Sequence, residues 1–429
     1  MARLMNSLMN EIDNDKKSFG YSEKQTMVKT DIPLFDYLNA QWEYTELGKE
    51  LNAGIDMGKP IYVVGKPGSG KSSFAIQMIG NIMRKFEESD LYIFDFEQSH
   101  TEGRIKSLTG FDETYFSGPG KRISIKSVDI YGETVLDMVY KIYKFKMENK
   151  KALMVDHPDG KIDPTTGQVK KMLPPTFIFI DSIASMQSKA VAEAEEIPGQ
   201  TQGGRTAIFN KGLINKTMQP CLAANIILVM INHVTSNMSM GVTPPVGQTK
   251  FLSNTKAVSG GSGLQYLVNL WIEIEPTDKL EPGGKTNPYG DLKGFRAKFN
   301  LVKSRNSEGG KSTTMIFNQR EGFDIDLSTF EFLKNVGAVK GAGIGLYLEN
   351  LPDKKFRMSL LKEKLATDAD FRGAFDALAK FYLDESVSQS SKTVKAEVEE
   401  EAPVEETTET ILLEGTSNEN MSDVLENIE

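Results

Sequence analysis

The sequence has little of several features that would place it in a specialised class. Its single cysteine, Cys221, cannot form a disulfide within one copy, which excludes a disulfide-stapled scaffold. No apolar run approaches the roughly 18 residues of a membrane-spanning helix, and the longest, residues 226–231, has the length of a strand. The first residues lack the charged start and apolar block of a secretion signal. We therefore expect a cytoplasmic protein without a membrane partner.

Acidic and basic residues are unevenly distributed. The formal net charge of the 429 residues is -9, but residues 396–429 hold twelve Asp or Glu and no Lys or Arg. Removing those twelve from the 59 acidic residues leaves 47 against 50 basic ones, so the rest of the chain is close to neutral. The overall acidity thus reports one tail, and it does not exclude a nucleic-acid partner.

Strand-like and helix-like segments alternate between residues 59 and 319. Seven short runs are rich in β-branched and aromatic residues: PIYVV, LYIFDF, TFIFI, NIILVMI, LVNLWIEI, FRAKFNLV and TTMIFN. Continuous apolar strands separated by helices predict an α/β fold with a mostly parallel central sheet covered on both faces. We assign this core to residues 41–325.

Three further segments flank or interrupt that core. Residues 1–40 form an N-terminal segment whose first 20 residues predict a short helix, docked either on its own domain or on a neighbouring subunit. Residues 326–388 predict a small, mainly helical domain, and residues 389–429 predict a disordered acidic tail. Residues 154–173 predict a hairpin insertion, and we interpret its three aspartates and His157 as a solvated turn rather than a calcium loop.

The strongest local signal is a phosphate-binding loop. Residues 65–72 match G-x-x-x-x-G-K-[ST], directly after the strand IYVV and before the helical SFAIQMIGNIM. Glycines let the backbone N–H groups turn toward phosphate oxygens, Lys71 reaches the β- and γ-phosphates, and the Ser72 hydroxyl suits Mg²⁺. The residues expected to hold ATP are Gly65, Lys66, Pro67, Gly68, Ser69, Gly70, Lys71, Ser72 and Ser73.

Carboxylates follow two of the predicted strands. Asp181 comes directly after TFIFI and would hold Mg²⁺, although an Asp at that place can also be a simple helix cap. Asp95 and Glu97 lie two residues apart at the end of LYIFDFE, so an extended strand would place them on one face. Either one could polarise an attacking water, or both could be solvated loop acids; the residues alone do not decide.

These elements, in this order, resemble the RecA-type recombinases, and most closely their bacteriophage UvsX branch. The resemblance covers residues 28–380 and includes VKTDIPLFDYLNA, GKPGSGKSS, YIFDFE, FIFIDSIASM, VMINH and VKSRN. It implies a RecA-like P-loop ATPase core, with Glu97 as the catalytic glutamate and His233 as the γ-phosphate sensor. It also implies that Lys303 and Arg305 reach the ATP site of a neighbouring subunit.

The residues fit these implied roles, and each also has a simpler explanation. Along FNLVKSR, Phe299, Leu301, Lys303 and Arg305 alternate and would share one face, so an apolar stripe would end in two cations. Such cations can stabilise charge on a transferring phosphoryl group, or they can be solvated edge charges. His233 can sense phosphate through its ring nitrogen, or it can simply cap the sheet.

Two long polar segments follow the core strands TFIFI and NIILVMI. Residues 186–206 and 234–259 are too long for simple connections, and the resemblance makes them the two DNA-binding loops. Lysines, backbone amides and apolar side chains can hold a single strand without reading its bases. The residues expected to contact DNA are Arg205, Lys250, Lys256, Gly260 and Gly261.

The resemblance implies an ATP-dependent DNA strand-exchange recombinase that forms a helical filament on single-stranded DNA and pairs it with homologous duplex DNA. A single-strand-binding protein and a loading mediator are further expected partners, and the location would be the host cytoplasm if the chain is phage-encoded. The alternatives are a RecA-fold hexameric helicase and a non-hydrolysing recombination mediator. The acidic tail is expected either to compete with DNA for basic surface or to act only as a solubility tail.

Overall fold

The structure is a computed structural model of the whole chain. It describes residues 27–400 except 46–47, 164–165, 194–201, 237–251, 253–255, 259–261 and 285–286, and some residues near these gaps and after residue 388 are described by their backbone only. The chain divides into two units, residues 1–387 and 388–429. No helix in the described part has the length and hydropathy needed to cross a membrane.

The first unit is built on one large sheet. Among the described residues its strands follow the order β16-β15-β14-β13-β5-β11-β10-β6-β7, and β12 (Lys256–Val258) pairs with β11 outside this row. The strands from β13 to β7 are parallel, and β13 to β16 are antiparallel. Their bounds are β5 (Ile61–Gly65), β6 (Asp90–Asp95), β7 (Ile123–Lys126), β10 (Thr176–Asp181), β11 (Ile226–Ser236), β13 (Leu270–Leu280), β14 (Gly294–Ser304), β15 (Ser312–Asn318) and β16 (Gly322–Asp324).

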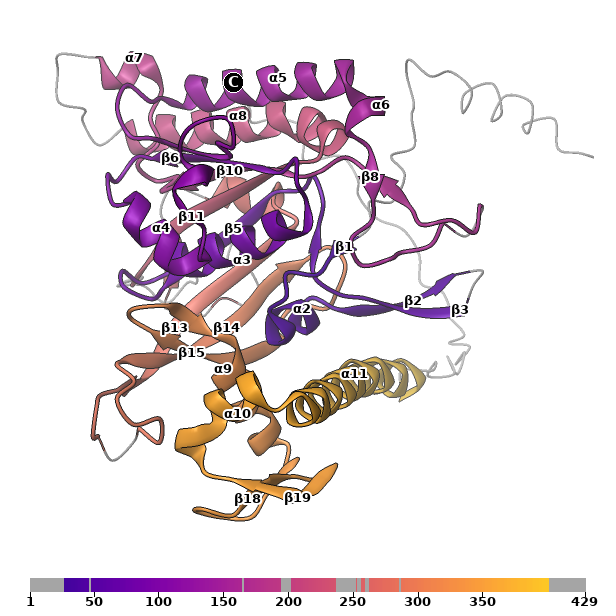
Figure 1. The fold of residues 1–429 in the computed structure, drawn as a ribbon. Helices are drawn as coiled ribbons and strands as arrows, with labels where there is room; N and C mark the ends of the chain where they lie inside the picture. The colour runs from indigo at the N-terminus through magenta and orange to yellow at the C-terminus, as the bar shows by residue number, and fades with distance from the viewer. Residues whose placement is uncertain are drawn as a thin grey trace, which may run out of the picture. The chain divides into compact units, whose positions relative to one another are not determined.

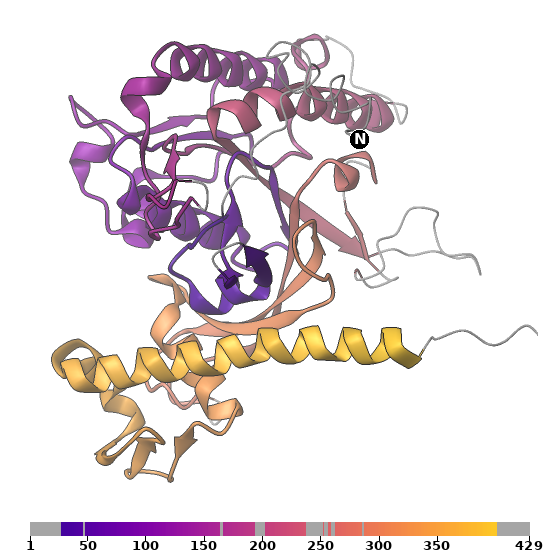
Figure 2. The ribbon, with the colours of Figure 1, turned by 90° about the vertical axis from the view of Figure 1, so that its right-hand side faces the viewer.

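The predicted α/β fold with a mostly parallel central sheet is confirmed, and all seven predicted strands are present. Helices cover both faces of the sheet (Figures 1 and 2): α3 (Lys71–Lys85) and α4 (Glu102–Thr109) on one, α5 (Gly132–Glu148) and α8 (Gln202–Ala224) on the other. Side chains alternate between the two hydrophobic clusters, so Val63 joins the α3 side and Val64 the α5 side. Burial on both faces explains why β5, β10 and the first six residues of β11 are continuous apolar runs.

The parallel strands also bring their carboxyl ends to one edge. Asp181 at the end of β10 is level with Asp95 at the end of β6, and His233 of β11 is level with Gly65 at the end of β5. Open parallel sheets place their ligands at this edge. The fold therefore gathers the motifs that the sequence separates by more than a hundred residues.

The segment before β5 contains elements that the strand pattern did not predict. β1 (Met27–Val28) pairs with β4 (Ile55–Asp56), and β2 (Gln41–Thr45) forms a hairpin with β3 (Gly48–Asn52). Between them, α2 (Pro33–Leu38) buries Asp36, whose Oδ1 accepts hydrogen bonds from the Thr30 amide at 2.9 Å and the Thr30 hydroxyl at 2.7 Å. Burial raises the pKa of Asp36 to about 7, against a partial lowering by those hydrogen bonds.

The predicted hairpin at residues 154–173 is present, after α6 (Lys150–Leu153), as the antiparallel pair β8 (Val155–Asp156) and β9 (Lys171–Met172). The solvated-turn interpretation is wrong for Asp159 and His157, whereas Asp156 is exposed as expected. Asp159 accepts from the Lys29 amide at 2.8 Å and from Lys85 Nζ at 3.1 Å, and His157 is only 2 % exposed. These contacts hold the hairpin against the rest of the unit, which a pattern of turn residues cannot reveal.

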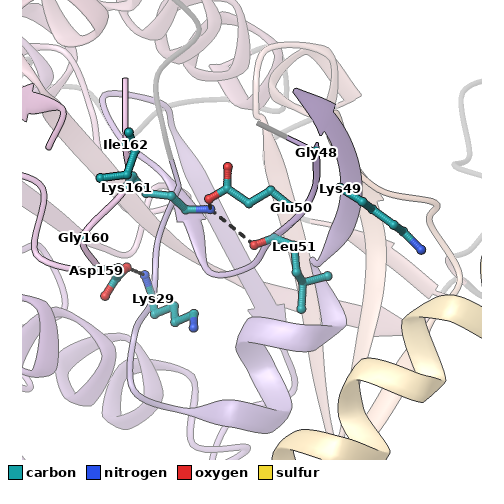
Figure 3. Close-up of a pocket in the computed structure, with 9 residues that line it drawn as sticks. All are labelled: Lys29, Gly48, Lys49, Glu50, Leu51, Asp159, Gly160, Lys161 and Ile162. Carbon is teal, nitrogen blue, oxygen red and sulfur yellow. Dashed lines mark hydrogen bonds and ion pairs between the residues drawn. The ribbon is translucent and has the colours of Figure 1, made fainter. Parts of the chain in front are cut away.

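A cavity of about 360 Å³ lies between this hairpin and β3 (Figure 3). Lys161 reaches across it to Glu50 Oε1 at 2.5 Å and to the Leu51 carbonyl oxygen at 3.3 Å. The amino groups of Lys29 and Lys49 point in different directions, away from one another (Figure 3). Lys161 thus joins the two hairpins through one ion pair and a hydrogen bond, and the charged residues that line the cavity do not converge toward a ligand.

The C-terminal part of the first unit is not only helical. It contains α9 (Ile325–Asn335), α10 (Leu361–Thr367) and the start of α11 (Ala369–Glu400), but also the three-stranded sheet β17 (Val339–Lys340), β18 (Leu346–Leu348) and β19 (Leu351–Phe356). Its apolar cluster includes Leu280 of β13 and Ile316 of β15, so it packs on the antiparallel strands of the central sheet. The domain boundary at residue 326 stays a prediction. The predicted N-terminal helix lies outside the described residues. The predicted disorder of the acidic tail is wrong for residues 389–400, which continue α11 as helix, and the rest of the tail lies outside the described residues.

Candidate functional site

The loop between β5 and α3 has the backbone that the glycine motif predicts. Gly70 is the N-cap of α3 with φ at +85°, a conformation that costs L-residues roughly 1–2 kcal/mol. Gly65 needs its missing side chain for a different reason, because a Cβ there would lie 2.4 Å from the Ile274 carbonyl oxygen. Lys66, Pro67 and Gly68 are exposed at the tip of the loop. These constraints leave backbone N–H groups at the start of α3 free to turn toward an anion.

Two polar groups of the loop are buried and lack the partner that a phosphate would supply. The Ser69 hydroxyl has no hydrogen-bond partner within the described part of the chain. Lys71 is 5 % exposed, and its ammonium donates to the Lys66 carbonyl oxygen at 2.8 Å. Burial lowers the pKa of Lys71, while attraction to Asp181 and Glu97 opposes that lowering. A buried cation in a glycine loop fits a phosphate ligand well.

Asp181 and Ser72 meet directly at this loop. The Ser72 hydroxyl donates to Asp181 Oδ2 at 2.6 Å, although 109 positions separate the two residues in the sequence. Asp181 is 3 % exposed at the end of the central strand β10. Because a hydroxyl can donate its hydrogen and still offer a lone pair, the pair can hold a Mg²⁺ ion through Ser72 and through water on Asp181. The donor set is the oxygen set that this cation prefers.

The structure separates Asp95 from Glu97, which the sequence could not. Asp95 is 1 % exposed and accepts from the amides of Ser99 at 3.1 Å and His100 at 2.8 Å, so it anchors the loop after β6. The Glu97 side chain is 30 % exposed beyond the strand end. The expectation that the two acids share one face is wrong because β6 ends at Asp95 and the chain turns there. Glu97 is therefore the more exposed of the two acids.

His233 lies between Glu97 and the phosphate loop. Its backbone is level with Gly65 in the β11–β5 pairing, and its Nε2 lies 3.0 Å from Glu97 Oε1. Its Nδ1 is buried and has no partner among the residues that the structure describes. The imidazole therefore links the loop that would hold the phosphates to the acid that would act on water.

Two residues at the site were not found from the sequence. His100 Nε2 lies 2.8 Å from Asp181 Oδ2, on the oxygen that Ser72 also contacts. Arg104 donates to the Ser73 hydroxyl at 3.1 Å and to the carbonyl oxygen of Arg320 at 2.8 Å, so Ser73 faces away from Asp181. The one sequence signal for their position was Thr101, a typical N-cap residue, which indicates that a helix begins directly after His100.

Lys303 and Arg305 lie away from this site. Lys303 is level with Trp271 of β13, near the amino end of β5, and donates to the Gln265 carbonyl oxygen at 2.6 Å. Arg305 follows the end of β14 and donates to the Tyr266 carbonyl oxygen at 2.8 Å. Both cations therefore contact η2 (Ser262–Tyr266), the 3-10 helix that follows the second predicted DNA loop.

The predicted common face of Phe299, Leu301 and Lys303 is wrong. A register shift between Trp271 and Ile272 leaves one extra residue, Val302, in β14. Phe299 and Leu301 join the α3 side of the core, whereas Val302 joins the α5 side together with Trp271, the partner of Lys303. A β-bulge of this kind reverses the alternation beyond it.

The predicted DNA-contacting residues fall largely outside the description. Arg205 lies within α8 and Lys256 within β12, each with its side chain outside the described residues. Lys250, Gly260 and Gly261 lie outside the described residues altogether. The structure describes parts of the two predicted loops: α7 (Lys189–Ala192) and the start of α8 in the first, and the end of β11 together with β12 in the second.

The comparisons with known proteins add no family to this description. A scan against protein-family models found no match, and neither did a search of curated proteins.

Within the described residues no group of three or more His, Cys, Asp or Glu side chains could hold a metal ion. A metal ion here would therefore depend on the phosphates of a nucleotide as well as on Ser72 and Asp181.

Proposed function

We propose that this protein is an ATP-dependent DNA strand-exchange recombinase with a RecA-like core, which assembles as a helical filament on single-stranded DNA. One observation carries the proposal. Lys71, Ser72, Asp181, Glu97 and His233, drawn from four separate segments, form a connected set at the carboxyl edge of the sheet. That set contains the phosphate-holding, cation-holding and water-orienting groups that nucleotide hydrolysis needs.

The chemistry assigned to each residue follows from its surroundings. The loop amides and the Lys71 ammonium bind the phosphates, and the buried setting strengthens their attraction for negative charge. Mg²⁺, bound with the nucleotide at Ser72 and Asp181, would neutralise charge on the phosphate oxygens. Glu97 orients the attacking water, and its contact with His233 at 3.0 Å links that step to β11.

The position of Lys303 and Arg305 supports assembly of several copies. Lys303 is level with Tyr62 through β13, whereas the phosphate loop begins at Gly65, at the opposite end of β5. The two cations therefore cannot reach the phosphates bound by their own chain. If they stabilise the transferring phosphoryl group, they do so for a nucleotide held by a neighbouring copy, and a head-to-tail contact of that kind builds a helix or a ring.

The link to DNA rests on how the loops are connected. The second predicted DNA loop begins directly after His233, which contacts Glu97, and η2, whose carbonyl oxygens bind Lys303 and Arg305, follows it in the sequence. A movement of the loop at either end would therefore also move a residue that we assign to ATP hydrolysis or one that contacts it. This connection supports DNA binding that depends on the nucleotide.

Electron microscopy of the full chain with single-stranded DNA tests the proposal. With a non-hydrolysable ATP analogue we expect open helical filaments, and with ADP or no nucleotide we expect few. Lys71→Ala is the control, because it removes the phosphate-binding cation and should abolish the difference between nucleotide states. Closed six-membered rings would favour the helicase. Equal coating of DNA in every nucleotide state would refute the proposed function.

A further inference from the structure

His100 is a buried imidazole held against the carboxylate assigned to Mg²⁺. Its side chain is 5 % exposed, and Nε2 lies 2.8 Å from Asp181 Oδ2. An ionised carboxylate can only accept a hydrogen bond, so Nε2 carries the hydrogen and donates it. A buried polar contact of this length orients both groups, because breaking it would leave each without its partner.

The fold fixes the position of this imidazole from two sides. The backbone N–H of His100 donates to Asp95 Oδ2 at 2.8 Å, which ties the residue to the end of β6. The ring meets the ring of Phe179 edge to face, with centroids 5.4 Å apart and planes at 82°. Phe179 lies two residues before Asp181 on β10. The donor is therefore held by the same two strands whose ends form the site.

Two donors converge on one oxygen of Asp181. The Ser72 hydroxyl and His100 Nε2 both contact Oδ2, and neither contacts Oδ1. The carboxylate cannot rotate without losing both hydrogen bonds, and Oδ1 stays available to a further donor such as a water molecule of a hydrated cation. Groups that orient a metal-binding carboxylate in this way typically change metal affinity when they are removed.

We propose that His100 is a positioning residue, which sets the orientation of Asp181 and thereby the affinity of the site for Mg²⁺ bound with a nucleotide. This inference rests on the proposed function, since it takes the nucleotide site as given. It differs from a purely structural role for His100, in which the ring only fills space beside Phe179. The two roles predict different results for substitutions that keep or remove the N–H donor.

The test compares His100→Gln with His100→Met. The two substituted side chains have similar length, but only glutamine can place an N–H near the position of Nε2. Binding of a fluorescent, non-hydrolysable ATP analogue is measured while Mg²⁺ is titrated, and again in EDTA. For His100→Met we expect the Mg²⁺ concentration at half-maximal effect to rise about 10-fold or more. We expect His100→Gln to stay close to wild type, and the affinity in EDTA to be the same for all three proteins.

The control is His157→Gln, which replaces another buried histidine, one that lies in the hairpin after α6. It should leave the Mg²⁺ dependence unchanged, and thermal unfolding shows whether each variant is folded. The proposal is overturned if His100→Met matches wild type, or if the Gln and Met variants shift equally. If wild type binds no nucleotide, the proposed function fails together with this inference. If wild type binds nucleotide but the His100 variants behave in either of these ways, only the inference fails.

Discussion

A mixing experiment follows from the distance between the cations of β14 and the phosphate loop. Lys71→Ala removes the cation that we propose binds phosphate, and a second variant carries Lys303→Ala with Arg305→Ala. Each alone should be nearly inactive as a DNA-dependent ATPase. If the cations act on a neighbouring copy, mixing the two inactive proteins should restore activity, because one can supply the phosphate loop and the other the cations.

The separation within one chain can be worked out from the sheet. Lys303 is level with Tyr62, three residues before Gly65, which is about 10 Å along a strand. β14 is also two strands away from β5, a further lateral distance of about 10 Å, so the backbones are roughly 14 Å apart. In addition, the Lys303 ammonium contacts the Gln265 carbonyl oxygen, away from the loop. Losing such cations costs about 10³-fold in rate when they act on the phosphoryl group.

The assay is phosphate release on single-stranded DNA. In a random filament of equal parts, a site works only when it combines the intact loop of one variant with the intact cations of the other, which is true for about one quarter of the sites. The turnover of the mixture should therefore recover to about one quarter of the wild-type rate. A protein with all three substitutions, mixed with Lys71→Ala, should recover nothing. If the first mixture stays inactive although energy transfer between labels shows coassembly, the cations do not act across copies.

Three further predictions test single residues. Glu97→Gln keeps an acceptor for His233 but loses the carboxylate, so nucleotide and DNA binding should persist while phosphate release slows by about 10²-fold or more; near-normal turnover would remove Glu97 from the mechanism. Gly70→Ala should lower the free energy of unfolding by about 1–2 kcal/mol because of its positive φ, whereas Gly103→Ala, with open space around it, should not; equal melting temperatures would contradict this. Burial raises the pKa of Asp36 from 3.8 to about 7, so wild type should lose stability as pH rises through that range, and Asp36→Asn should flatten the urea-unfolding profile; parallel profiles would exclude this role.

The strands and the glycine-rich loop between β5 and α3 could be predicted because their signals are local, and the phosphate-binding role of that loop stays a prediction. The seven predicted strands are runs rich in apolar and β-branched residues, and the positive φ of Gly70 is a requirement of the loop itself, whereas the steric limit at Gly65 comes from the Ile274 carbonyl oxygen of β13. The short strands β7 and β16, with four and three residues, carry too little pattern to stand out. Strand β2 alternates polar residues with Trp42 and Tyr44, but its partner β3 contains a single large apolar residue, Leu51, so the pair carries only a weak strand pattern.

The parts of the site that escaped prediction depend on tertiary contacts. His100 follows β6 in the sequence, and only the parallel pairing of β6 with β10 brings it to Asp181. Asp95 and Glu97 look equivalent until the end of β6 separates a buried anchor from an accessible acid. Assignment of the DNA-contacting residues stays a prediction, since it rests on a resemblance and on side chains outside the described part of the chain.

Because β14 contains one extra residue at Val302, the face of the sheet on which Lys303 lies depends on the pairing register of the strand as well as on its composition. Regular pairing of β14 without the bulge would place Val302 opposite Trp271 and turn Lys303 toward the α3 side of the sheet, without altering a single charge. A shift of one position in the pairing of β14 beyond Leu301 would therefore move each side chain there to the opposite face of the sheet, while the apolar residues before Leu301 would keep their faces.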